Sequence, residues 1–285
     1  MDTAKVIDSL PVYTANGECS PDTIKAYRRA AKFFINWTEQ HGKSIDDADE
    51  EDAHIYVYEM YNSGLKRDAV NQRIAGARAF FRTAIAIGEF DAVNPFASIK
   101  GKISNPDDAT TRYYTNDEVK IIYDACESDR ERAIILLMAI EGLRTIEVTR
   151  LKIQDCDFPN GRIMIHGKGN NNAFVYPSEK TEQILTKYIG SRTNGEIFRN
   201  DIDGGALTRD GVRYIVNAIL RRCKMKRKGN SCHALRHSCG TNLYAATKDI
   251  RLVQETLRHQ SPEVTARYAH VVNRKNATGI ITNGL

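Results

Sequence analysis

A polar segment without periodicity interrupts the chain about a third of the way along its length. Residues 97–112 read ASIKGKISNPDDATTR, which contains glycine, proline and charges but no apolar repeat at helix or strand spacing. Such a segment cannot cross a hydrophobic core, because its backbone needs water or other polar partners. The chain is therefore predicted to form two domains, residues 1–100 and 113–285, joined by a linker at 101–112.

The first domain carries the signals of helices. Ser20 is suited to cap a helix N-terminus and Pro21 to its first turn, and apolar residues then recur at helical spacing. A second helix is predicted over residues 53–61, and a third from Asp68 to about Gly88. Residues 1–100 are therefore expected to form a helical bundle.

The second domain is predicted to be mostly helical with a small antiparallel sheet, which makes the whole chain mainly α. Asn160-Gly161 is a hairpin turn signal between strands predicted at 153–158 and 162–166, and a short strand is predicted at 173–176. Helices are predicted from Thr115 and at 133–140, 178–189, 208–223, 233–246, 250–257 and 262–271.

The composition suits a globular protein. Hydrophobic residues make up 41% of the 285 residues and charged residues 27%, and no apolar run approaches the roughly 20 residues that a membrane span needs. The first residues are polar and lack the apolar core of a secretion signal. The six cysteines are scattered, which indicates reduced thiols, so we expect a cytoplasmic protein with no membrane partner.

The formal net charge of +5 is distributed unevenly. Residues 221–228 read RRCKMKRK and contain six cations, whereas residues 46–52 read DDADEED and contain six acids. The basic run could meet a phosphate backbone or could form a solvated helix end, and the local sequence leaves both interpretations open.

Six polar residues form an ordered set in the second domain. Singly, each also has a structural interpretation, such as a surface ion pair, a helix cap, a loop lysine or a buried tyrosine. Together they supply two fixed cations for a phosphate, proton carriers for the entering and leaving oxygens, and a phenol as nucleophile. The set therefore predicts cleavage of a phosphodiester without metal or nucleotide, and it comprises Arg144, Lys168, His233, Arg236, His259 and Tyr268.

The same residues allow other interpretations. Gly167-Lys168-Gly169 lacks the spacing of a nucleotide-binding P-loop. Glu147 could be an ordinary salt-bridge partner of Arg144 or could orient it towards a substrate. Zinc would have to use residues whose spacing matches no standard finger or ribbon, and Arg236 would put a cation beside the metal. We therefore expect no metal and no cofactor; the rejected zinc ligands are Cys232, His233, His237 and Cys239.

At these residues the chain resembles the tyrosine recombinase (phage integrase) family. Residues 1–100 are similar to the family's helical, SAM-like core-binding domain, and residues 113–285 to its catalytic domain. The chain departs from the usual pattern at Arg258, where the family usually has glycine, and at Cys239-Gly240, where a bulkier apolar residue is more usual. The matching pieces are Gly142-Leu143-Arg144-x-x-Glu147, the glycine-flanked Lys168, His233-x-Leu235-Arg236-His237, Leu257-x-His259 and Thr265-x-x-Tyr268-x-His270.

The resemblance implies a site-specific recombinase. Tyr268 would attack a DNA phosphate to give a 3′-phosphotyrosine and a free 5′-hydroxyl, while Arg144 and Arg236 neutralise the phosphate oxygens. Lys168 would be the general acid for the 5′-oxygen. His233 would accept the proton of the tyrosine, and His259 would donate a hydrogen bond to the phosphate.

The implied partners are double-stranded DNA and further copies of the chain, in a synaptic tetramer on DNA. The resemblance leaves open whether accessory DNA-bending or directionality proteins take part, and whether the outcome is integration, excision, inversion or dimer resolution. Two alternatives remain at this point, a type IB topoisomerase-like enzyme that relaxes DNA and a catalytically silent DNA-binding regulator.

Overall fold

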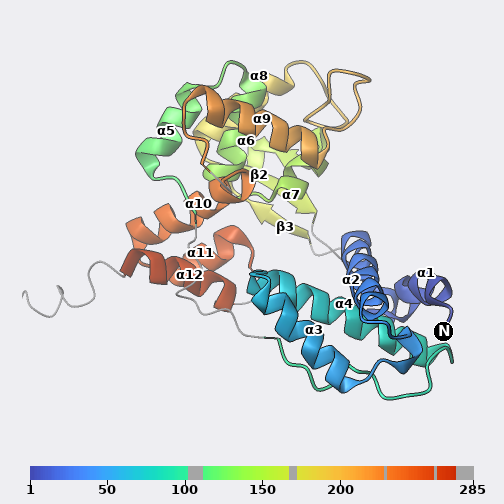
Figure 1. The fold of residues 1–285 in the computed structure, drawn as a ribbon. Helices are drawn as coiled ribbons and strands as arrows, with labels where there is room; N and C mark the ends of the chain where they lie inside the picture. The colour runs from blue at the N-terminus through green and yellow to red at the C-terminus, as the bar shows by residue number, and fades with distance from the viewer. Residues whose placement is uncertain (102–111, 167–171, 228–229, 260–261, 274–285) are drawn as a thin grey trace, which may run out of the picture. The chain divides into compact units, whose positions relative to one another are not determined.

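A computed structural model of the chain describes residues 1–101, 112–166, 172–227, 230–259 and 262–273 (Figure 1). The chain divides into two compact units, Met1–Asp108 and Ala109–Leu285. Each unit has buried apolar clusters of its own. The described part of the chain contains no helix that is both long and apolar enough to cross a membrane.

The first unit is a bundle of four α-helices within its described residues. Ser20 caps α2 as predicted, because its side chain accepts a hydrogen bond from the backbone N–H of Thr23. The first helix was not predicted; it contains Pro11, and only Val6 and Leu10 are buried, which leaves a short periodic signal. The helices are α1 (Thr3–Tyr13), α2 (Pro21–Gln40), α3 (Glu50–Asn62) and α4 (Arg67–Ala86).

The core of the first unit is aromatic. The ring of Phe34 lies edge-on to those of Tyr56, Phe81 and Phe96, with centroids between 4.9 and 5.8 Å apart. Gly76 on α4 lets this helix approach α2 closely, because a β-carbon at this position would lie only 2.4 Å from the β-carbon of Ala30. These aromatic side chains therefore pack against one another inside the bundle.

The second unit is built around α6, whose residues 133–139 are all buried. Helices α8, α9 and α10 pack against it. The predicted helices are present, with ends within a few residues of those expected, and one further short helix, Thr145–Arg150, was not predicted. The helices described in this unit are α5 (Asn116–Asp124), α6 (Asp129–Ala139), α7 (Thr145–Arg150), α8 (Glu179–Ile189), α9 (Arg209–Arg222), α10 (Cys232–Thr247), α11 (Ile250–Leu257) and α12 (Pro262–Asn273).

The sheet of the second unit has three antiparallel strands in the order β1-β2-β3: β1 (Cys156–Asp157), β2 (Arg162–His166) and β3 (Asn172–Val175). The strand predicted at 153–158 was too long. Ile153–Asp155 and Phe158–Asn160 are 3₁₀ turns instead, the first capped by Asp155 and the second containing a proline that cannot donate to a ladder.

Candidate active site

The turn after α6 places Arg144. Gly142 adopts a φ of 66°, and a β-carbon there would lie 2.6 Å from Cδ2 of Leu257, so glycine fits both the turn and the space. Arg144 then becomes the N-cap of α7. Glu147 accepts hydrogen bonds from the backbone N–H and Nη1 of Arg144, both at 2.8 Å. Glu147 therefore holds Arg144 at its main chain and at its guanidinium.

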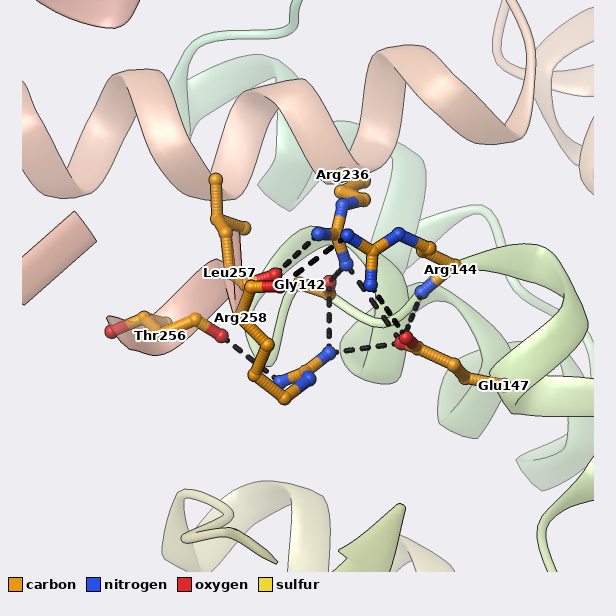
Figure 2. A network of polar contacts seen from close by, with 7 residues as sticks. All are labelled: Gly142, Arg144, Glu147, Arg236, Thr256, Leu257 and Arg258. Carbon is orange, nitrogen blue, oxygen red and sulfur yellow. Dashed lines mark hydrogen bonds and ion pairs between the residues drawn. The ribbon is translucent and has the colours of Figure 1, made fainter. Parts of the chain in front are cut away.

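Arg236 joins the segments that precede two other predicted site residues. It lies on α10 and is only 6% exposed. Its Nη1 donates to the carbonyl oxygen of Gly142, and its Nη2 donates to the carbonyl oxygen of Leu257 (Figure 2). Arg236 thereby ties α10 to the turn before Arg144 and to the end of α11, which His259 follows.

Charges concentrate at Glu147, which is buried. Burial alone would raise the pKa of Glu147, but the charge of Arg258 and the hydrogen bonds from Arg144 outweigh it and lower the pKa. Burial, and next the charge of Arg144, lower the pKa of Arg236 to about 10. Both side chains are therefore charged at neutral pH.

His233 lies in the first turn of α10. Desolvation is the largest cause that lowers its pKa below the ordinary value of 6.5, and the charges of Arg236, Arg213 and Arg144 lower it further. The imidazole is therefore neutral at pH 7, which is the state of a proton acceptor.

Tyr268 lies on α12 in a small apolar cluster with α10 and α11, and is 1% exposed. Its hydroxyl lies 3.0 Å from Nδ1 of His237. Its ring is stacked on that of His259 at a centroid distance of 6.1 Å and an angle of 10°. His259 in turn lies with its Nδ1 2.9 Å from Oγ1 of Thr265. Histidine and tyrosine are thus neighbours, with the phenol buried.

Gly240 makes room for the tyrosine. A β-carbon at this position would lie 2.7 Å from Cζ of Tyr268 and 2.8 Å from Cδ1 of Leu257. The departure from the usual bulkier residue therefore lets the phenol ring lie directly against α10.

The predicted site residues are placed as follows. The segments of Arg144, Arg236 and His259 meet through the bonds of Arg236, and Tyr268 stacks on His259. Lys168 lies outside the described residues. The predicted site included no role for His237, and its contact with the tyrosine was missed because it joins residues 31 positions apart. Within the described parts of the chain, no three His, Cys, Asp or Glu side chains gather to hold a metal.

Comparison with known proteins identifies the family. The sequence model of the phage integrase family matches residues 112–275, and that of the phage integrase N-terminal SAM-like domain matches residues 12–88. The chain therefore belongs to the phage integrase family, and it is a tyrosine recombinase. These matches do not favour the topoisomerase-like or regulator alternatives.

Similar individual proteins are also recombinases. The tyrosine recombinase XerC of Staphylococcus saprophyticus is 27% identical over 266 residues, which cover 90% of this chain and 88% of the relative. The XerC proteins of several Staphylococcus aureus strains match over the same lengths at the same identity.

Solved structures show the same fold. XerH recombinase bound to a palindromic difH substrate, in a post-cleavage complex, aligns with a TM-score of 0.76 at 21% identity over 98% of this chain and 84% of that one. A lambda integrase dimer bound to a COC′ core site aligns with a TM-score of 0.70 at 19% identity over 93% of this chain and 94% of that one.

Proposed function

We propose that this chain breaks and rejoins double-stranded DNA at a specific site through a 3′-phosphotyrosine formed on Tyr268. The observation that carries the proposal is the buried Arg236, whose bonds bring together the segments of Arg144 and His259. Guanidinium groups fixed in this way can replace a metal, because phosphoryl transfer depends chiefly on positioning and on electrostatic stabilisation.

The bond changes balance within the proposed site. The phenolic oxygen of Tyr268 attacks phosphorus, its proton passes to His233, and the bond from phosphorus to the 5′-oxygen breaks. Lys168 protonates the departing oxygen to give a free 5′-hydroxyl. The phosphotyrosine ester conserves the energy of the broken bond, so rejoining by a 5′-hydroxyl needs no ATP.

Three side chains would stabilise the transition state. Arg144 and Arg236 would neutralise the non-bridging oxygens as negative charge develops, and His259 would donate a hydrogen bond to one of them. The neutral state that desolvation and the nearby cations favour at His233 supports its role as proton acceptor.

Tyr268 must leave its buried position before it reacts. At 1% exposure, its hydroxyl reaches a phosphate only after the ring leaves Gly240 and the contact with His237 breaks. We propose that DNA binding drives this release, with Tyr268 acting either in its own subunit or in a neighbouring one.

The remaining assignments rest on the family. We propose that residues 1–100 bind DNA as a core-binding domain, joined by the linker at 101–112 to the catalytic domain at 113–285. Four copies would form a synaptic complex on DNA. The similar solved structures include XerH recombinase bound to a difH substrate and lambda integrase bound to a COC′ core site, which supports DNA as the partner. All six cysteines are free thiols, which supports a cytoplasmic location.

The test uses a nicked suicide duplex, from which a covalent adduct cannot be resolved. Wild-type chain is first used to capture such duplexes covalently from a pool with random sequence. Tyr268→Phe is expected to bind the captured duplex normally and to form no adduct, because only the nucleophile is lost. Arg144→Ala is expected to lower the rate of adduct formation by about a hundredfold or more while binding changes far less.

A persistent adduct in the Tyr268→Phe variant would remove this residue from the role of nucleophile. Equal losses of binding and cleavage in the Arg144→Ala variant would count against its assignment to the phosphate.

A further inference from the structure

Arg258 occupies a backbone conformation that favours glycine. It ends α11 as the C-cap with φ 53° and ψ 50°, in the left-handed region. A side chain with a β-carbon is strained there, and the related family pattern usually has glycine at this position. Glycine would relieve this strain, but it could not make the contacts that the arginine side chain makes.

The side chain of Arg258 points towards Glu147 and Gly142 and is 12% exposed (Figure 2). Its Nη2 lies 2.9 Å from Oε2 of Glu147 and 3.4 Å from the carbonyl oxygen of Gly142. Its Nη1 donates to the carbonyl oxygen of Thr256 at 2.9 Å. Arg258 thus shares two acceptors, Glu147 and Gly142, with the proposed phosphate-binding residues.

The main chain of Arg258 contributes as well. Its carbonyl oxygen accepts a hydrogen bond from Nη2 of Arg144 at 3.5 Å. Glu147 therefore meets Arg144 at Oε1 and Arg258 at Oε2, while Nη1 of Arg236 lies 3.8 Å from Oε2. One buried carboxylate is held between three guanidinium groups from three elements.

The count of charges favours a bound phosphate. Three arginines and one glutamate give a net charge of 3 − 1 = +2, and removal of Arg258 would leave 2 − 1 = +1. A phosphodiester carries one negative charge, and more develops on its oxygens in the transition state. Arg258 also engages Oε2 at 2.9 Å, closer than Arg236 at 3.8 Å.

We propose that Arg258 is a positioning residue for the recombination reaction: by binding Oε2 of Glu147 it fixes the carboxylate that orients Arg144 and limits the ion pairing of Arg236. The inference rests on the proposed function, because it concerns the same phosphate site. Arg258 acts through Glu147 and need not touch DNA.

The main test variant is Arg258→Gly, which removes the guanidinium and relieves the backbone strain. The matched control is Lys248→Gly at the C-cap of α10, where φ is 57° and the same relief occurs away from Glu147. Both variants are expected to fold. With the suicide duplex captured by wild-type chain, Arg258→Gly is expected to form the adduct about tenfold to a hundredfold more slowly at saturating DNA, as misplaced catalytic groups do. Its Kd for the duplex should stay within about twofold.

A pH profile separates positioning from a purely structural role. The charged groups that face Glu147 are Arg144 from α7, Arg236 from α10 and Arg258 from the end of α11. Removal of one cation raises the pKa of Glu147, so the acid limb of the rate profile should move to higher pH in Arg258→Gly. His233 titrates in the same assay, but Arg258 is not among the charges that lower its pKa, which are those of Arg236, Arg213 and Arg144. Lys248→Gly should keep the wild-type profile.

A double-mutant cycle tests the route through the carboxylate. If Arg258 acts through Glu147, the variant with both Arg258→Gly and Glu147→Gln should be about as slow as Glu147→Gln alone. Multiplied losses, an unmoved acid limb, or equal rates for Arg258→Gly and wild type would each overturn the inference. Failure of the proposed function would look different, because wild-type chain would then capture no duplex from the pool.

Discussion

His166, the last residue of β2, makes a titratable hydrogen bond beside its ladder partner Asn172, the first residue of β3. His166 lies with Nε2 2.8 Å from Oδ1 of the buried Asp155 and with Nδ1 3.2 Å from Oδ1 of Asn172. Two oxygen acceptors favour an imidazolium that donates from both nitrogens. Hydrogen bonding to Asp155 is the main reason that the pKa of His166 is raised above its ordinary value of 6.5.

The sign of the pH effect follows from this direction. Because the folded state binds the proton more tightly, the stabilisation is complete below pH 6.5 and is lost as pH rises through the higher folded pKa. We predict that the free energy of unfolding, measured with urea across this range, falls less with pH in His166→Asn than in the wild type. His54→Asn, at an exposed helix position, serves as control. Parallel curves for His166→Asn and wild type would contradict the prediction.

Arg258 also marks the limit of sequence reasoning at the residue scale. Glycine was the residue expected from the family, and the sequence indicated only that the turn departs from the usual pattern. The side chain's bond to Glu147 joins residues 111 positions apart. No local pattern encodes such a pairing, since it depends on how the end of α11 meets the turn before α7.

At the scale of elements, α10, α11 and α12 form one cluster around Tyr268, with Val253 and Leu257 fully buried. We predict that Gly240→Ala destabilises this cluster by about 1–3 kcal/mol, because its β-carbon would overlap the phenol ring and Leu257. Gly211→Ala on α9 is a control in which the nearest atom is a Leu207 methyl group at 2.7 Å.

Two quantities are measured. Denaturant unfolding gives the stability, and chemical modification of tyrosine with peptide mapping gives the solvent exposure of Tyr268. Gly240→Ala should expose Tyr268 more than the control does. Unchanged stability and unchanged modification in Gly240→Ala would contradict the prediction, because they would show that the buried position of the Tyr268 ring does not require glycine at position 240.

Local signals predicted the helices well and the sheet less well. Ser20 marks the start of α2, and the range predicted for α11, 250–257, is the observed one. The first strand was predicted too long, because a hydrogen bond from the backbone of Lys152 to Asp155 and the proline at 159 favour 3₁₀ turns over a ladder on either side of it. Capping signals act within a few residues, whereas strand length depends on a partner strand.

At the scale of the whole molecule, much of the basic run at 221–228 is bonded within the protein. Arg222 pairs with Glu131 at 2.9 Å and Glu127 at 3.0 Å, and Arg227 pairs with Glu118. The structural interpretation of these cations is therefore favoured over direct phosphate contact.

We predict that the double variant Arg222→Ala/Arg227→Ala leaves the slope of log Kd against log salt unchanged on a random-sequence duplex. Lys25→Ala/Lys32→Ala, at exposed positions on one face of α2, should reduce its magnitude by about 1–2, as loss of phosphate contacts does. Fluorescence anisotropy gives both slopes. A reduced slope in the first variant, with none in the second, would reverse the assignment.

The ordered polar set pointed to Arg144, Arg236 and His259, whose segments are joined by the bonds of Arg236, because each motif combines a chemical group with a turn or helix start. It did not predict that Tyr268 is 1% exposed and contacts His237, since burial depends on packing between α10 and α12.

The most direct test of the account is to map the covalent bond itself. Wild-type chain is trapped on the captured suicide duplex, digested with trypsin and nuclease, and analysed by mass spectrometry. The account predicts a nucleotide phosphate on the peptide that contains Tyr268 and on no other peptide. A phosphate found on a different residue, with Tyr268 unmodified, would contradict it.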